Sequence, residues 1–229
     1  MLGLPRAHYR LTDSTNQRAG ELAASGAPHG TLVTAHAQRA GRGRGGREWT
    51  APPGSSVLMS LLLRELDELL PLAASVAVSE ACEAAGVNCA IKWPNDVWID
   101  GRKVAGILVE GRPQEGWAVL GIGLNVSTSS EELPVELRET ATSIGIAAGG
   151  APSVEGLLDT LLDTLEVRLA DDRETVLAAW RQRDALRGRT VRWQEGQGVA
   201  VGVDASGALQ VDTHAGRVAL DAQEVHLLR

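Results

Sequence analysis

The fold is decided by residues 90–110, which read AIKWPNDVWIDGRKVAGILVE. Two short β-rich runs, at residues 90–93 and 97–99, precede the dipeptide Asp100-Gly101, which strongly favours a two-residue hairpin turn. The chain then returns through a third β-rich run at residues 103–110. This pattern predicts consecutive strands joined by a tight turn, and hence a sheet at the centre of the protein.

The flanking sequence predicts that helices pack on this sheet. Further strands are expected at residues 8–11, 31–35, 55–63 and 117–126, and helices at 15–24, 66–85, 153–170 and 173–186. Asp13 or Ser14 is expected to cap the first helix, and Gly86 to end the second. A polar stretch at residues 127–139 interrupts the pattern.

Composition changes at Gly188, after the last predicted helix. Residues 190–228 alternate short β-rich runs with turns at 204–207 and 213–216, which predicts a small β-barrel. We therefore expect a boundary at residues 187–189, between a larger domain at 1–187 and a small β domain at 188–229.

The composition is that of a globular protein, with 229 residues, 44% hydrophobic residues and a formal net charge of −7. No apolar run is long enough to span a bilayer, so a cytoplasmic location without membrane contact is expected. Cys82 and Cys89 are interpreted as small buried residues rather than as a disulfide or a metal site. The negative charge argues against broad nucleic-acid binding.

A basic, glycine-rich segment stands out against this acidity. Residues 38–49 hold four arginines and four glycines, a composition suited to closing over a small phosphorylated or carboxylated molecule. Gly41-x-Gly43-x-x-Gly46 also fits the dinucleotide fingerprint, but two prolines at 52–53 argue against the helix that this motif requires. A solvated flexible linker remains the structural alternative.

Several separated motifs resemble those of the biotin protein ligases, also called biotin–[acetyl-CoA-carboxylase] ligases. They are Asp13-Ser14-Thr15-Asn16, Gln38, residues 41–47 with Trp49, Lys92-Trp93-Pro94-Asn95-Asp96, residues 101–108 and residues 121–126. The resemblance covers essentially the whole chain. It implies an α+β fold, in which a mixed-sheet catalytic domain of the class II aminoacyl-tRNA synthetase/biotin synthetase type precedes an SH3-like β-barrel.

The resemblance also implies an activity and its partners. Biotin and Mg-ATP would form biotinyl-5'-AMP and pyrophosphate, and biotin would then pass to a lysine of a biotin carboxyl carrier domain. ATP and Mg2+ are the expected cofactors. Because the motifs start by Asp13, we expect a ligase without an N-terminal winged helix-turn-helix and without a DNA partner. The strand at residues 121–126, taken as an edge strand, is either a homodimer contact or covered.

Site residues follow from the resemblance, position by position. Lys103, Arg44 and Arg42 are expected to supply the catalytic charges, and Asp96 a weak magnesium ligand. The residues expected to bind biotin are Ser14, Thr15, Asn16, Gln38, Arg42, Gly43, Arg44, Lys103 and Gly106. Those expected to bind ATP or the adenylate are Arg44, Arg47, Trp49, Asn95, Asp96, Lys103 and Asn125.

Other interpretations stay open at this stage. Ser14, Thr15 and Asn16 could serve only as helix-capping residues, and Trp49 could be a core side chain. A lipoate or octanoate ligase of the same superfamily is the nearest rival function. A module that binds single-stranded nucleic acid through the basic loop and Trp49 is the rival from another class.

Overall fold

The computed structural model describes residues 1–65, 67–221 and 225–228. A seven-stranded sheet with the order β1-β2-β3-β7-β6-β5-β4 forms its centre. Only β1 and β2 run parallel among its paired neighbours, so the sheet is mixed, as predicted. Its strands are β1 (Arg6–Tyr9), β2 (Leu32–Ala35), β3 (Ser56–Leu63), β4 (Ala90–Lys92), β5 (Asp96–Ile99), β6 (Arg102–Arg112) and β7 (Trp117–Asn125).

The predicted hairpin turn is confirmed. Asp100 has φ 50° and Gly101 has φ 76°, the pair of left-handed conformations that a type I′ turn requires. Ile99 pairs with Arg102 across the turn, and β6 then continues between β5 and β7. This register sets which side chains of β6 point to each face of the sheet.

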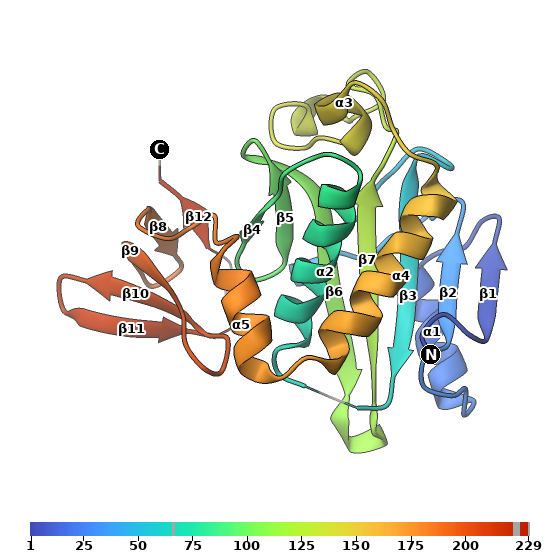
Figure 1. The fold of residues 1–229 in the computed structure, drawn as a ribbon, viewed down its shortest axis with the longest axis horizontal. Coiled ribbons are helices and arrows are strands. Elements are labelled where there is room, and N and C mark those ends of the chain that lie inside the picture. The colour runs from blue at the N-terminus through green and yellow to red at the C-terminus, as the bar shows by residue number, and fades with distance from the viewer. Residues whose placement is uncertain (66, 222–224, 229) are drawn as a thin grey trace.

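Helices cover the two faces of the sheet unequally. Helices α2 (Leu70–Ala84) and α4 (Val154–Ala170) lie on one face and α1 (Thr15–Ala24) lies on the other (Figure 1). Along β3, Val57, Met59 and Leu61 join the core cluster that includes residues of α2 and α4. Because side chains alternate along a strand, Leu58 and Ser60 face the side of α1. That side holds the functional site.

The C-terminal residues form a second, five-stranded antiparallel sheet with the order β11-β10-β9-β8-β12. Helix α5 (Arg173–Arg181) lies between this sheet and the rest of the molecule (Figure 1). The strands are β8 (Thr190–Trp193), β9 (Gly196–Val203), β10 (Leu209–Thr213), β11 (Gly216–Leu220) and β12 (His226–Leu227).

The two sheets share one hydrophobic core. Trp180 of α5, Leu72 of α2 and Trp93 belong to the same buried cluster as Val191 and Leu209 of the second sheet. The Trp93 indole Nε1 also donates a 2.9 Å hydrogen bond to the carbonyl of Gly207. The C-terminal sheet is therefore packed directly against elements of the first 187 residues.

Some predicted boundaries were wrong. The first strand spans Arg6–Tyr9 rather than 8–11, and the second predicted helix begins at Leu70; Leu66, its expected first residue, lies outside the described part. The helix predicted to reach residue 186 ends at Arg181, because residues 183–185 leave it to pair with Ile91. The Ile91 nitrogen donates to the Arg183 carbonyl at 2.7 Å, and the Ala185 nitrogen donates to Ile91 at 2.9 Å.

The expectation of an edge strand at residues 121–126 was also wrong. Strand β7 lies between β3 and β6 and is paired on both sides, so it offers no free edge. Short elements not predicted from the sequence are α3 (Ile144–Ala148) and the 3-10 turns η1 (Arg44–Gly46), η2 (Pro113–Glu115) and η3 (Val135–Leu137). Among the helices described, none is long and apolar enough to cross a bilayer.

Candidate functional site

A cavity of about 260 Å³ opens on the sheet face that carries α1. Its floor comes from β6 and β7, where three of the lining residues are glycines and leave little side chain in the way. Its walls come from the start of α1, the basic loop and the segment after β7. The strand residues that line it are Leu58, Gly106, Ile107, Leu108, Gly121, Ile122, Gly123 and Asn125.

One end of the cavity is a buried polar cluster. The Gln38 Oε1 accepts hydrogen bonds from the Thr15 backbone nitrogen at 2.7 Å and from its Oγ1 at 3.1 Å. The Ser60 hydroxyl lies within hydrogen-bond distance of Thr15 Oγ1, at 2.8 Å, and of Asn16 Oδ1, at 2.6 Å. Ser14 is the N-cap residue by position, but its side chain makes no capping hydrogen bond. Capping therefore does not account for these polar residues, and they are available to a ligand with both donors and acceptors.

The basic loop folds back on itself beside this cluster. The Gly43 nitrogen donates to the Arg47 carbonyl at 2.7 Å, and the Trp49 nitrogen donates to the Gly41 carbonyl at 2.9 Å. Gly45, at φ 66°, makes the tight turn at its tip. The dinucleotide-binding interpretation fails here, since a three-residue 3-10 turn, Arg44–Gly46, replaces the long helix that it needs.

Trp49 lies flat against the glycine floor. Its indole touches Gly123 and comes within 3.1 Å of the position that a Cβ on Gly106 would occupy. The Lys103 Nζ stands 5.6 Å from the ring centroid, within cation–π range. The indole Nε1 is buried without a hydrogen-bond partner among the described residues, so a donor is left for a ligand acceptor.

Lys103 and the neighbouring polar residues are fixed by their surroundings. The Lys103 Nζ pairs with Asp96 Oδ1 at 2.6 Å, and its backbone nitrogen donates to the Thr140 carbonyl at 2.8 Å. The Asn95 Nδ2 donates to the Ile107 carbonyl at 2.7 Å, and the Asn125 Nδ2 to the Thr142 carbonyl at 3.0 Å. The segment after β7 is thereby tied to the cavity by hydrogen bonds to its backbone carbonyls, one from the Lys103 backbone and one from the Asn125 side chain.

A further carboxylate, Glu110 of β6, joins the polar cluster to the loop. It accepts a hydrogen bond from the Asn16 Nδ2 at 2.8 Å and forms an ion pair with the Arg42 Nη1 at 3.0 Å. Glu110 and Ser60 were not predicted as site residues. The alternation of β6 places Gly106, Leu108 and Glu110 on one face, which is the sequence signal that could have found Glu110.

The resolved pKa shifts of buried groups lie outside the cavity. Burial raises the pKa of Asp184, whose Oδ2 is buried without a partner among the described residues. A hydrogen bond to Cys89, followed by burial, raises the pKa of the Cys82 thiol. Both cysteines are free; Cys82 is buried in the main core as predicted, whereas Cys89 is only partly buried against it.

The structure brings every predicted site residue to the lining of this one cavity. Among the described residues, no group of three or more His, Cys, Asp or Glu side chains could hold a metal ion. The site is thus a concave surface with three parts: the neutral polar cluster at one end, the cationic side chains of the basic loop and Lys103, and the flat indole of Trp49. Such an arrangement suits a ligand with a polar neutral ring, an anionic centre and a second flat ring.

Comparison with known proteins identifies the class. Residues 8–127 match the biotin/lipoate A/B protein ligase family. The biotin--[acetyl-CoA-carboxylase] ligase of Paracoccus denitrificans is 36% identical over 235 residues, covering 93% of this chain and 97% of that protein. The enzyme of the same name from Mycobacterium tuberculosis is 34% identical over 237 residues, covering 95% and 87%. The chain therefore belongs to the biotin/lipoate A/B protein ligase family.

Within this family, the chain is similar to the biotin protein ligases. The biotin protein ligase of Aquifex aeolicus in complex with biotin and ATP superimposes with a TM-score of 0.86 and 28% sequence identity. The superposition covers 98% of each chain, so it includes both sheets.

Proposed function

We propose that this protein is an ATP-dependent biotin protein ligase. It joins biotin to ATP as biotinyl-5'-AMP, releases pyrophosphate, and transfers biotin to a lysine of a biotin carboxyl carrier domain. The observation that carries this proposal is the single cavity in which a neutral polar cluster, Lys103 and Trp49 meet. The names of the relatives and the biotin and ATP complex of the Aquifex aeolicus enzyme support it.

The polar cluster is proposed to hold the ureido ring of biotin. That ring is neutral and carries both donors and acceptors, which hydroxyl and amide groups match. Thr15, Asn16 and Gln38 present such groups around the buried end of the cavity, with Ser14 beside them. Gly43 and Gly106 line the same cavity and are proposed to contact biotin through their backbones.

The cations are proposed to act where the new bond forms. Joining a carboxylate to the α-phosphate brings two anions together, so their repulsion must be neutralised and the attacking oxygen held in line. Lys103 is proposed to contact both groups, moving from its ion pair with Asp96 to the ligand. Arg44 reaches the same cavity from the loop, and Arg42 lies two residues before it.

Trp49 is proposed to stack on adenine, with Arg47, Asn95 and Asn125 placed to contact the nucleotide. Magnesium would be held mainly by the phosphates and water, with Asp96 as its single protein carboxylate, which is a fit that magnesium commonly accepts. When bound, the ion would neutralise phosphate charge. The unpartnered Trp49 Nε1 is a further donor that the nucleotide could use.

Domain organisation and partners are proposed on the same basis. Residues 1–187 are proposed as the catalytic domain and residues 188–229 as an SH3-like domain that helps to contact ATP or the carrier. The net charge of −7 supports a protein that has no DNA partner. We propose that the protein acts in the cytoplasm, where ATP is available, and that it does not bind membranes. A homodimer is also proposed, in which the contact is made by a strand edge other than β7.

The test is biotin-dependent exchange of labelled pyrophosphate into ATP, run beside lipoate and octanoate and repeated with Lys103→Ala. Exchange with biotin alone, lost in the variant, supports adenylation of biotin at this site. Exchange with lipoate or octanoate would redirect the assignment within the family. No exchange with any acid would reject the ligase function, and salt-sensitive binding of single-stranded nucleic acid would then favour a binding module.

A further inference from the structure

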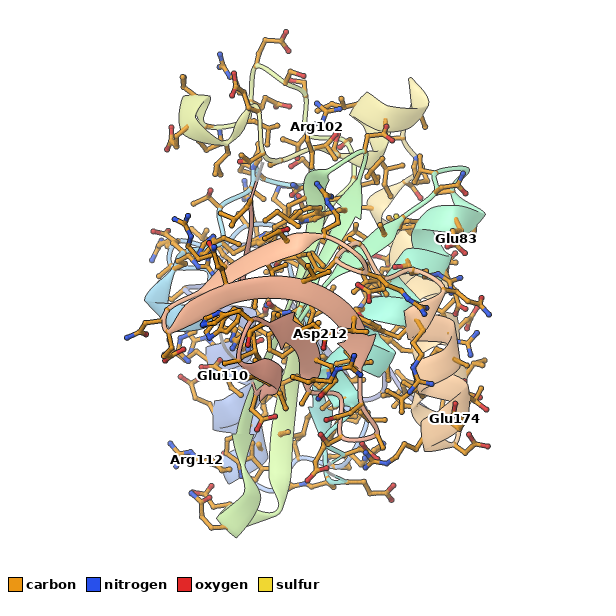
Figure 2. The ribbon with its side chains drawn as sticks, turned by 90° about the vertical axis from the view of Figure 1, so that its left-hand side faces the viewer. Glu83, Arg102, Glu110, Arg112, Glu174 and Asp212 are labelled. Carbon is orange, nitrogen blue, oxygen red and sulfur yellow. The ribbon has the colours of Figure 1, made fainter. Side chains whose placement is uncertain are left out.

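Glu110 connects two parts of the site that are far apart in the sequence. Its carboxylate meets the Asn16 Nδ2 at 2.8 Å and the Arg42 Nη1 at 3.0 and 3.3 Å. Figure 2 shows Glu110 on the side of the sheet turned away from Glu83 of α2 and Glu174 of α5, which is the side of the cavity. One side chain thus contacts both the polar cluster and the basic loop.

The contact with Asn16 sets the orientation of its amide. Asn16 is 6% exposed, and its Oδ1 lies 2.6 Å from the hydroxyl of Ser60, which is fully buried. A carboxylate can only accept hydrogen bonds, so Glu110 must face the NH2 group of Asn16 and not its oxygen. The amide is therefore held at both ends, and its outward edge is presented to the cavity in one arrangement.

The contact with Arg42 ties the loop to strand β6. Loop residues 40–48, with Leu108 and Glu110, enclose a hollow of about 560 Å³, so this part of the loop is not packed onto a core. An ion pair from β6 to Arg42 then restrains the loop where packing does not. The pair also sets a carboxylate against the Arg42 guanidinium, so part of its charge is balanced within the protein.

We propose that Glu110 is a positioning residue that orients the Asn16 amide and anchors the basic loop through Arg42. The proposal rests on the proposed function, because the affected ligand is biotin. It gives the Arg42 side chain a role in holding the loop, beside the contact with the ligand already proposed for it. Glu110→Ala removes both contacts, whereas Glu110→Gln keeps an oxygen that can accept from Asn16 and loses the charge opposite Arg42.

The matched control is Glu155→Gln. Glu155 of α4 forms a comparable pair with Arg6 of β1, at 2.7 and 3.1 Å, on the face of the sheet that carries α4. This variant removes one carboxylate charge and one arginine pair without touching the loop or the polar cluster. An effect seen in both Glu110→Gln and Glu155→Gln would then be a general effect of losing one carboxylate charge.

Three readouts separate positioning from simple support of the fold. We expect the Kd of biotin, measured by calorimetry, to rise about tenfold in Glu110→Ala and about threefold in Glu110→Gln. We expect kcat of pyrophosphate exchange to change much less than Kd. Trypsin should cleave the unliganded loop, at its arginines, several times faster in Glu110→Ala than in the wild type. Glu155→Gln should match the wild type in all three.

Unchanged biotin affinity in Glu110→Ala, or an unchanged rate of loop cleavage, would overturn the proposal. So would an equal effect of Glu155→Gln. These results differ from a failure of the proposed function, which would appear as wild-type protein that binds biotin without catalysing exchange. Trypsin cleavage needs no activity, so it still decides whether Glu110 holds the loop.

Discussion

The contact between Trp49 and Gly123 allows a test of the proposed stacking of Trp49 on adenine, because one added carbon at Gly123 would displace the indole. Gly123 lies in β7 without a left-handed conformation, so alanine fits its backbone. The new Cβ, however, would stand 2.7 Å from the indole Nε1 and 2.8 Å from Cδ2, and closer still to Cε2. Because favourable carbon contacts need about 3.5–4.0 Å, the indole must move by roughly 1 Å.

The size of the effect follows from this displacement. Forcing an extra methyl group into a packed contact costs about 1–3 kcal/mol, which corresponds to roughly 5- to 150-fold in affinity. The indole can shift into the cavity on its other side, so we expect a free-energy cost in the lower part of the range of about 1–3 kcal/mol. We expect Gly123→Ala to raise KM for ATP about tenfold in the exchange assay, with little change in KM for biotin or in Tm.

Two controls make this prediction strict. Gly150→Ala adds a methyl group where no atom lies within 4 Å, and it should leave KM for ATP unchanged. In the background of Trp49→Ala, the added methyl group has no ring to displace, so Gly123→Ala should have little further effect. A full effect in that background, or no effect in the wild type, would refute the proposed role of Trp49 as the adenine platform.

Three other predictions concern the loop, a buried carboxyl group and a helix. Arg44→Gly should weaken retention of the adenylate, so that mass spectrometry finds biotin on lysines of unrelated proteins; strict carrier specificity would contradict this. Burial raises the folded-state pKa of Asp184 above its usual 3.8, so its contribution to stability is largest below that value and is lost as pH rises through the raised pKa. The unfolding free energy of the wild type should therefore fall relative to that of Asp184→Asn as pH rises, and a difference independent of pH would exclude this cause. Gly20→Ala in α1 should stabilise the protein by about 0.5–1 kcal/mol in urea unfolding, because its Cβ would meet the Trp117 ring at an ordinary 3.7 Å; destabilisation would show that this contact is not tolerated.

Local signals predicted much of the fold. Helix α1 spans residues 15–24 as expected, and the Asp100-Gly101 turn has the predicted conformation. Gly86, expected to end the second helix, has φ 85° directly after Ala85, the C-cap of α2. In each case the residues that decide the structure are neighbours in the chain, so the sequence contains the physical cause.

Features that depend on distant residues were missed. Capping of α1 by Asp13 or Ser14 was expected, but Ser14 holds the N-cap position without a side-chain capping hydrogen bond, and the Thr15 nitrogen donates to Gln38, 23 residues away. The end of α5 is fixed by pairing of residues 183–185 with Ile91, which no local pattern indicates. Glu110 escaped notice because its importance comes from Asn16 and Arg42, which only the folded chain brings to it.

The core shared by the two sheets has a consequence for recombination between relatives. Trp93, Trp180 and Leu72 are buried partly by residues of the C-terminal strands, so removing those strands would expose apolar surface on α2, α5 and the end of β4. A chimera joined at residue 188 would place two unmatched halves of one core together. Exchange of the C-terminal sheet between homologues should succeed only when the facing side chains of α2 and α5 are exchanged with it. The smallest transplantable unit of this protein is therefore larger than its C-terminal sheet.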